Sequence, residues 1–267
     1  MLTIYRWENG GLRETPEFAP SCWVNLVDPT TTELEAVIAA KNVPRDFLTD
    51  PLDRDERPRF DYDDDATLLI VHVPCPVEGD EVAPYCTVPL GIVLTGESVI
   101  TVCSMRTPVT SAFLDQIRRV CPPKDKYRFA FRLLWHGGVL FLRYLHDIHQ
   151  RTNLLEEELH ESISNKVLLK LLTIEKTFVY FTTSLKADTI ALARANTARQ
   201  IQLSEDDRDC LEDAMVEYQQ ALDTNTHPRP FQRSNRAESP FPAILDCRLS
   251  SGNAPRLCPD TKNRRQE

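Results

Sequence analysis

The stretch of residues 126–223 constrains the fold most, because its pattern predicts three consecutive long helices with almost no turn residues inside them. Residues 126–162 carry apolar side chains at steps of three, four or seven, which gives the first helix one apolar face. At 1.5 Å per residue this helix spans roughly 55 Å, more than the width of a small domain. We therefore expect the helices to bury their stripes against each other or against neighbouring copies.

The other two helices carry similar stripes. The second begins near Ser164, and its apolar residues from Val167 to Leu185 follow a 4-3-4-3-4 spacing, which is typical of a coiled-coil seam. Such a seam requires a partner helix. The third begins at Ser204, whose hydroxyl can cap the first turn. Its stripe consists of Leu211, Met215, Tyr218 and Leu222.

The first 125 residues alternate short strands with short helices, which predicts an α/β domain with layers of helices on a mixed sheet. We expect strands at residues 2–7, 22–27, 59–62, 67–73, 87–94 and 98–103, the last two forming a hairpin. Helices are expected to begin at Thr30, where Glu33 completes a capping box, at Pro44, and at Thr110, the last reaching Val120.

The chain thus divides into an α/β domain (1–125), a long-helix region (126–223) and a tail (224–267). The tail has six prolines and no sustained periodicity, so we expect it to be disordered. It interrupts an unbroken helical pattern without a Gly or Asn cap. We therefore hypothesise a truncated or out-of-frame ending, which translation of the other two reading frames would test.

Composition excludes several classes of protein. A net charge of −9 disfavours nucleic acid as a partner, because a phosphate-binding surface requires a surplus of Lys and Arg. Eight scattered cysteines without a C-x-x-C pair or a signal peptide indicate reduced thiols in the cytoplasm. The longest uncharged run, residues 82–96, is shorter than the roughly 20 apolar residues of a membrane span. We expect a soluble, cytoplasmic chain.

Catalytic motifs are missing as well. The sequence has no G-x-S-x-G, no phosphate-binding loop and no G-x-G-x-x-G. We predict no catalytic residues and no enzyme activity. Gly137 and Gly138 inside the first long helix indicate close contact with another helix or a kink, and we favour close contact.

Two patterns resemble metal sites but have simpler interpretations. A D-x-D-x-D run lacks the Gly and the Glu of a calcium loop, which favours a solvated turn; its residues are Asp61, Asp63, Asp64 and Asp65. A stripe on the first long helix has the E-x-x-H spacing of di-iron bundles, but only once; its residues are His146, His149, Glu157 and His160. We expect that stripe to be a solvated face.

The start of the third helix is the better candidate for a cation contact. Asp206, Asp209 and Asp213 lie on one side, where like charges repel by a few tenths of a kcal/mol per pair unless a cation lies between them. Most such runs are merely solvated. A divalent-cation contact becomes more favourable if several copies bring these faces together.

Several segments, taken in order, resemble the cytoplasmic part of the CorA family of magnesium transporters. They are Trp-Val-Asn-Leu at 23–26 before the capped helix at 29–34, Phe-Leu-Thr-Asp-Pro-Leu-Asp at 47–53 with Glu-Arg-Pro-Arg at 56–59, Tyr-Asp-Asp at 62–64 before the strand at 68–71, and Leu-Glu-Asp at 211–213 with Glu217 and Gln-Ala at 220–221. Together they extend over about 220 residues of the chain.

The resemblance implies an α/β/α sandwich, two long antiparallel helices, and a stalk helix that leads to two membrane spans in a homopentamer conducting Mg²⁺. It also implies a location at the cell's inner membrane, with this part in the cytoplasm. In the family, acidic residues of the sheet domain and of an adjacent subunit's early stalk hold a divalent ion that favours the closed channel. Onto this chain we carry over Asp209 and Asp213, with Mg²⁺ or Co²⁺ as the regulatory ion; residues 78–81, Glu-Gly-Asp-Glu, are an unaligned candidate for the opposing loop.

The chain departs from the family pattern, because it has no Gly-Met-Asn and no membrane span. By itself it should not conduct ions. We expect a regulatory domain whose last helix continues toward a membrane. The alternative is a soluble helical scaffold that binds a protein partner through its helix seams. A last helix that covers its own stripe within a self-contained monomer would favour this alternative.

Overall fold

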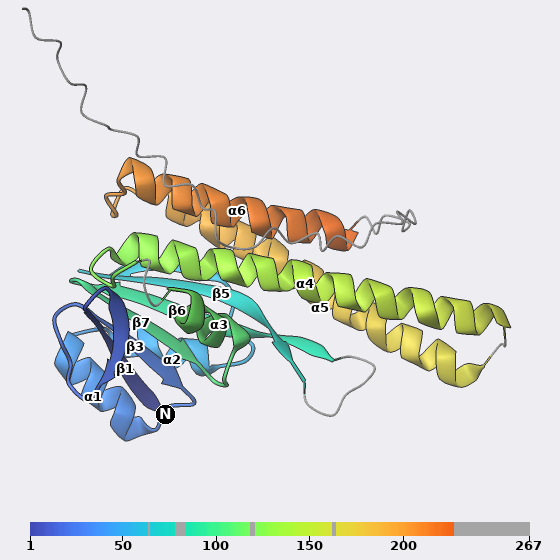
Figure 1. The fold of residues 1–267 in the computed structure, drawn as a ribbon, viewed down its shortest axis with the longest axis horizontal. Coiled ribbons are helices and arrows are strands. Elements are labelled where there is room, and N and C mark those ends of the chain that lie inside the picture. The colour runs from blue at the N-terminus through green and yellow to red at the C-terminus, as the bar shows by residue number, and fades with distance from the viewer. Residues whose placement is uncertain (64, 78–83, 118–120, 162–163, 227–267) are drawn as a thin grey trace, which may run out of the picture. The chain divides into compact units, whose positions relative to one another are not determined.

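The computed structural model describes residues 1–63, 65–77, 84–117, 121–161 and 164–226. Its centre is a seven-stranded sheet with the strand order β2-β1-β3-β7-β6-β5-β4 (Figure 1). β3 pairs with β7 in parallel and all other neighbours are antiparallel, so the sheet is mixed as predicted. The strands are β1 (Leu2–Glu8), β2 (Gly11–Thr15), β3 (Cys22–Val27), β4 (Arg59–Asp63), β5 (Ala66–Pro76), β6 (Tyr85–Thr95) and β7 (Ser98–Cys103).

One strand, β2, was not predicted. Gly11–Thr15 is short and largely polar, so its sequence has no clear strand pattern. Asn9 and Gly10 both have positive φ, at 51° and 75°, which is the geometry of a tight two-residue hairpin. The Asn-Gly pair was therefore a hairpin signal, and β2 forms the edge of the sheet next to β1.

One face of the sheet is covered by α1 (Thr31–Lys41), α2 (Arg45–Thr49) and the short η1 (Asp50–Leu52). The predicted capping box opens α1: Thr30 Oγ1 accepts from the Glu33 amide at 3.3 Å, and the Glu33 carboxylate accepts from the Thr30 amide at 2.8 Å. Leu34, Val37 and Phe47 are buried with apolar side chains of β3, β5 and β7. Burial of this face fixes α1 and α2 against the sheet.

The opposite face is covered by α3 (Pro108–Ile117) and by the long helices, which gives the predicted α/β/α layering. Trp23 is buried here, with Phe113 of α3 in edge contact at 5.8 Å and Phe129 tilted at 5.5 Å. Such aromatic pairs add to the stability that burial alone provides. Of the helix predicted at 110–120, residues 118–120 lie outside the described part.

The three long helices are α4 (Lys126–Glu161), α5 (Asn165–Thr197) and α6 (Glu205–Thr226), close to their predicted bounds (Figure 1). Ser164 caps α5, as its hydroxyl accepts from the Lys166 amide. α6 continues to Thr226, beyond the predicted end at Asp223, because Asn225 attaches its last turn to α5. Asn225 Nδ2 donates to the Phe178 carbonyl at 2.9 Å and to Thr182 Oγ1 at 2.5 Å. The rest of the predicted tail lies outside the described residues.

α6 packs closely on α4, as the glycine pair predicted. A Cβ atom on Gly138 would lie 2.6 Å from Glu217 Cβ, and one on Gly137 would lie 2.6 Å from Tyr218 Oη. Leu211, Ala214 and Tyr218 are fully buried. α6 therefore covers its apolar stripe within its own chain, against α4 and α5. Among the helices that the structure describes, none has the length and apolar character required to cross a bilayer.

Candidate functional site

The acidic surface of α6 lies at the opening of the helix. Ser204 and Asp207 form a reciprocal cap there: Ser204 Oγ accepts from the Asp207 amide at 3.2 Å, and Asp207 Oδ2 accepts from the Ser204 amide at 3.1 Å. Carboxylates in a first turn are also stabilised by the helix dipole. Part of the acidic run therefore has a structural role, which the capping residue Ser204 predicted.

Arg128 of α4 forms ion pairs with carboxylates at this end of α6. Its guanidinium donates to Asp206 at 2.9 Å and lies 3.7 Å from Asp207. This residue was not predicted, because nothing in the sequence shows that the start of α6 packs beside the start of α4, with the two helices parallel. Asp206 was expected to share a side of the helix with Asp209 and Asp213, but it is paired with Arg128 instead.

Asp209 and Asp213 remain exposed on α6. Side chains four residues apart on a helix are neighbours, with Cβ atoms about 5–6 Å apart, so both carboxylates can reach one cation. Glu217 lies four residues further along, so Asp209, Asp213 and Glu217 form an acidic row on α6. Its pKa is raised, first by partial burial and further by the charge of Asp213, while a hydrogen bond from Trp135 opposes the rise.

The row does not complete a metal site within one chain. Among the residues that the structure describes, no three His, Cys, Asp or Glu side chains are placed to hold a metal ion together. The loop at 78–81, our unaligned candidate for the opposing ligands, lies outside the described residues. Water or another copy of the chain could supply further oxygen ligands beside Asp209 and Asp213.

Asp61 and Asp63 lie at the end of β4, and Asp65 lies in the turn before β5. Asp61 accepts a hydrogen bond from Arg59, and Asp63 and Asp65 are exposed. Asp64 is outside the described part of the chain. This arrangement matches the solvated turn that we favoured over a calcium loop.

The histidine stripe on α4 is divided between solvent and the helix interface. His146, Glu157 and His160 are exposed, whereas His149 is partly buried, with its ring 4.8 Å from that of Phe178. Burial lowers the pKa of His149 below its usual value. The stripe is therefore the solvated face that we expected, except at His149, which packs against α5.

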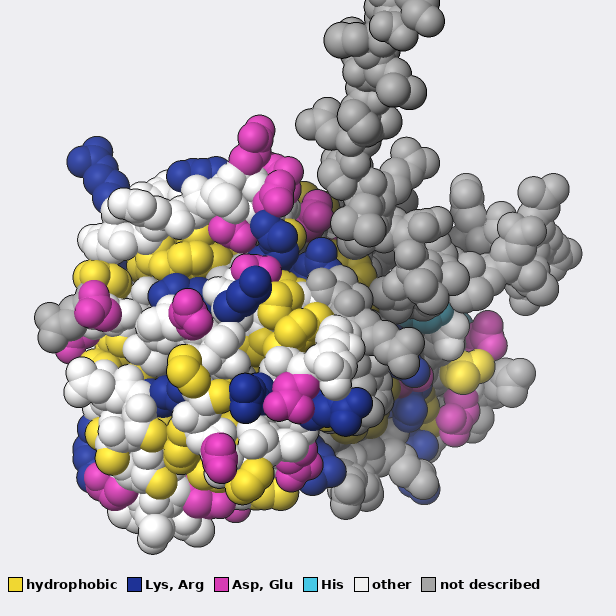
Figure 2. All heavy atoms as spheres, turned by 60° about the vertical axis from the view of Figure 1, so that its left-hand side comes forward, with side chains coloured by type: hydrophobic (Ala, Val, Ile, Leu, Met, Phe, Trp, Pro, Cys, Tyr) yellow, Lys and Arg dark blue, Asp and Glu magenta, His cyan; other side chains and the backbone are white. Residues whose placement is uncertain are grey.

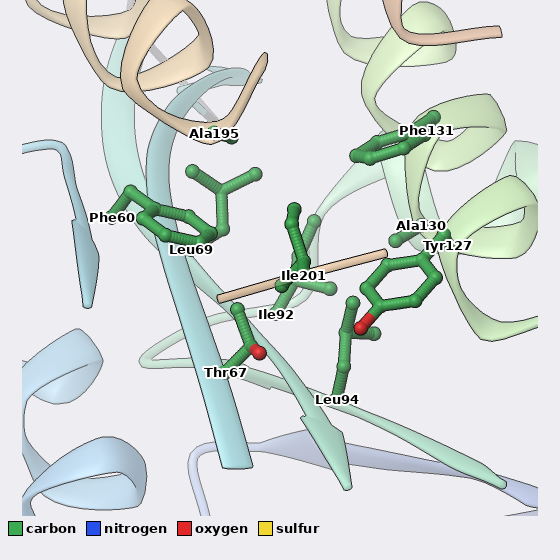
Figure 3. A pocket seen from close by; sticks show the side chains of 10 residues that line it. All are labelled: Phe60, Thr67, Leu69, Ile92, Leu94, Tyr127, Ala130, Phe131, Ala195 and Ile201. Atoms are coloured by element: carbon green, nitrogen blue, oxygen red, sulfur yellow. The ribbon is translucent and has the colours of Figure 1, made fainter. Parts of the chain in front are cut away.

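An apolar cavity lies between the sheet and the long helices (Figure 3). Phe60, Leu69 and Ile92 approach it from the sheet, and Tyr127 and Phe131 from α4. Its volume is about 10 Å³. That is the room for roughly one water molecule, so the cavity does not fit a substrate.

Charges are mixed on the side of the molecule that includes the beginning of α6. Among the described residues drawn in Figure 2, acidic and basic side chains alternate without a continuous basic patch. A phosphate backbone is bound by clustered Lys and Arg. This side therefore lacks the features of a nucleic-acid interface.

The fold and the sequence were compared with known proteins. No curated protein matches the chain. The soluble domain of CorA from Methanocaldococcus jannaschii is similar with a TM-score of 0.73 and 22% identity, over 85% of this chain and 91% of that one. The complete CorA magnesium transporter of the same organism gives 0.72 and 21%, over 85% and 72%. The ZntB cytoplasmic domain from Vibrio parahaemolyticus gives 0.66 and 12%, over 84% and 90%.

At these identities the solved structures establish the fold alone, which is that of a CorA soluble domain. The sequence itself matches a family model described as "CorA-like Mg2+ transporter protein" over residues 19–227, which is most of the chain. The match includes strands β3 to β7, the long helices, and Asp209 and Asp213 of α6, whereas β1 and β2 precede it. The chain belongs to the CorA-like Mg²⁺ transporter family, a family of transporters and not of enzymes.

Proposed function

We propose that this chain is a cytoplasmic regulatory domain of a CorA-like Mg²⁺ transporter. In this proposal Asp209 and Asp213 bind a regulatory divalent cation, Mg²⁺ or Co²⁺, together with oxygen ligands from an adjacent copy in a homopentamer. The described residues do not include a pore, and conduction is not part of the proposal.

The observation that carries the proposal is the orientation of α6. Leu211, Ala214 and Tyr218 of its apolar side are fully buried against α4 and α5, while Asp209 and Asp213 are exposed. Mg²⁺ is held by oxygen ligands in an octahedral shell and usually keeps several waters. Two carboxylates with their remaining positions filled by water and by an adjacent copy fit that chemistry.

The covered stripe of α6 affects the choice between our two hypotheses. We expected that a last helix folded back on its own chain would favour a soluble scaffold. The helix does fold back, yet the chain belongs to the transporter family. That criterion was therefore wrong: α6 buries one side within the chain and still leaves its acidic side open to another copy.

The first experiment measures cation binding through stability. A ligand that binds only the native state raises the melting temperature. We expect millimolar Mg²⁺ or Co²⁺ to raise the Tm of the wild-type chain, and Asp213→Asn to reduce the shift. At about 100 times the dissociation constant the stabilisation is about 2.7 kcal/mol.

Two controls make this experiment specific. Sodium chloride at the same ionic strength separates screening of the acidic surface from binding. Glu157→Gln, on the exposed stripe of α4, removes an acidic group far along the chain from α6 and should leave the shift unchanged. If no divalent cation changes the Tm at any concentration, the regulatory site does not exist.

A second candidate function rests on α5. Several of its large apolar side chains are exposed, with Leu169 and Tyr180 each at 65% and Val179 at 62%. This exposed row suits a protein partner, as the scaffold hypothesis requires, or another copy of the chain. Light scattering after size exclusion distinguishes a different protein partner from another copy of the chain, because a scaffold requires no self-association. The pentamer and a coiled-coil seam between copies stay predictions.

A further inference from the structure

Asp188 of α5 is a fully buried carboxyl group at the junction of three elements. Its Oδ1 accepts from the His72 amide of β5 at 2.7 Å. Its Oδ2 has no hydrogen-bond partner among the described residues. The sequence contains a signal for this position, because Asp188 continues the spacing of Phe181, Leu185 and Leu192 on the apolar side of α5. Asp188, an ionisable residue, therefore occupies a position where the pattern calls for an apolar side chain.

The second unpartnered group at this junction belongs to α6. Tyr218 is fully buried, and its hydroxyl has no hydrogen-bond partner among the residues described. It interacts electrostatically with Asp188, so the two side chains are close. On its other side the hydroxyl meets α4 at Gly137, where a Cβ would be 2.6 Å away.

His72 does not supply a compensating positive charge. Its Nδ1 lies 3.0 Å from Ser184 Oγ and its Nε2 lies 3.0 Å from the Glu56 carbonyl oxygen, which accepts a hydrogen bond from Nε2–H; the neutral ring then accepts at Nδ1 from the Ser184 hydroxyl. Burial lowers the pKa of His72 and raises that of Tyr218 well above its usual value, so both stay neutral near neutral pH. Tyr218 is thus the titratable group of α6 that interacts with Asp188, and His72 of β5 contacts Asp188 through its backbone amide.

An ionised Asp188 would therefore be a buried charge stabilised by one backbone amide alone. Such a charge costs several kcal/mol, and buried carboxyl groups respond by retaining a proton. We propose that the docking of α6 on α5 and the sheet depends on a proton bound to Asp188, which makes the position of α6 sensitive to pH. This inference rests on the buried junction and does not require the cation site.

Proton linkage gives the sign and the size of the pH dependence of α6 docking. Burial raises the pKa of Asp188 in the docked state, whereas in an undocked state the exposed carboxyl ionises with a pKa near 3.9. Undocking therefore releases one proton. The stability of docking is fully present below the undocked pKa and is lost as pH rises toward the docked pKa. Between the two pKa values, the equilibrium constant for undocking rises about tenfold per pH unit.

Hydrogen exchange of the α6 amides tests this prediction between about pH 6.5 and about pH 8. In the upper part of that window, above about pH 7, undocked histidines are mostly neutral and undocked thiols mostly protonated, so their contribution is small. A chelator keeps divalent cations out, which separates this experiment from the test of the cation site. After correction for intrinsic exchange rates, we expect wild-type protection of α6 to fall as pH rises, by up to about tenfold per pH unit while the pH is below the docked pKa of Asp188.

Matched variants test whether Asp188 causes the pH dependence of α6 protection. Asp188→Asn keeps an oxygen for the His72 amide but cannot ionise, and α6 protection should become independent of pH. Asp188→Leu repeats the test with a neutral side chain of similar size in case the amide is poorly tolerated. Glu212→Gln, an exposed change on α6, and Glu217→Gln, a partly buried one, should keep the wild-type slope. A flat wild-type profile, or equal slopes in wild type and Asp188→Asn, would overturn the proposal.

Discussion

Glu33 shows how one side chain joins the first strand to the first helix. Its carboxylate accepts from the Thr30 amide in the capping box, and also from the Leu2 amide at 2.8 Å and the Met1 amino group at 3.1 Å. These bonds, the one from Thr30 foremost, lower the pKa of Glu33 to about 2. The capping box was predictable from sequence spacing, but the contact with β1 was not.

The lowered pKa makes a prediction about acid stability. The contribution of Glu33 is present above its unfolded pKa of about 4.3 and is lost as pH falls toward about 2. We expect Glu33→Gln to reduce the free energy of unfolding by roughly 1 kcal/mol at about pH 6, and by much less at about pH 2. Urea denaturation at both pH values measures this difference. Glu97→Gln, in the exposed β6–β7 turn, is the control; an equal loss at both pH values would contradict the assignment.

The helices and strands differ in how well the sequence predicted them. α4, α5 and α6 have sustained apolar periodicity, and α5 and α6 also follow a capping serine, so these local signals placed their bounds closely. β2 lacks periodicity and was missed, and the end of α6 was misplaced because Asn225 stabilises it through a contact with α5. A contact between distant segments, such as that of Asn225 with α5, leaves no such local signal.

The candidate cation site on α6 also combines features that local sequence predicts with features that depend on distant contacts. Helical spacing alone placed Asp209 and Asp213 on one side of α6. Their exposure and the pairing of Asp206 with Arg128 depend on how α6 packs against α4. Asp188 was overlooked because its neighbours come from β5 and α6, far away in sequence.

The contact between α4 and α6 gives a prediction about a helix pair. In Gly138→Ala the new Cβ would overlap Glu217 Cβ, a backbone-proximal atom that cannot move without moving α6. We expect the variant to be destabilised by about 1–3 kcal/mol despite the better helix propensity of Ala. Thermal or urea denaturation gives the value.

A matched change separates packing from propensity. Asn153→Ala alters an exposed position of α4 and should be neutral or slightly stabilising. Should Gly138→Ala prove as stable as Asn153→Ala, the two helices do not approach as closely as described.

At the scale of the whole molecule, the sheet and α4 position α6 so that one side is buried and the other is acidic and exposed. The apolar contacts determine where α6 lies, and Asp209 and Asp213 then point away from the chain that carries them. A regulatory ion shared between copies would therefore link occupancy of the site to association of the chains.

The most direct measurement is the molar mass of the chain by light scattering, with and without millimolar Mg²⁺. The account predicts that Mg²⁺ increases self-association of the wild-type chain, and that Asp209→Asn with Asp213→Asn abolishes the increase at matched ionic strength. A mass that is the same with and without Mg²⁺, or an increase that survives in the double variant, would contradict it.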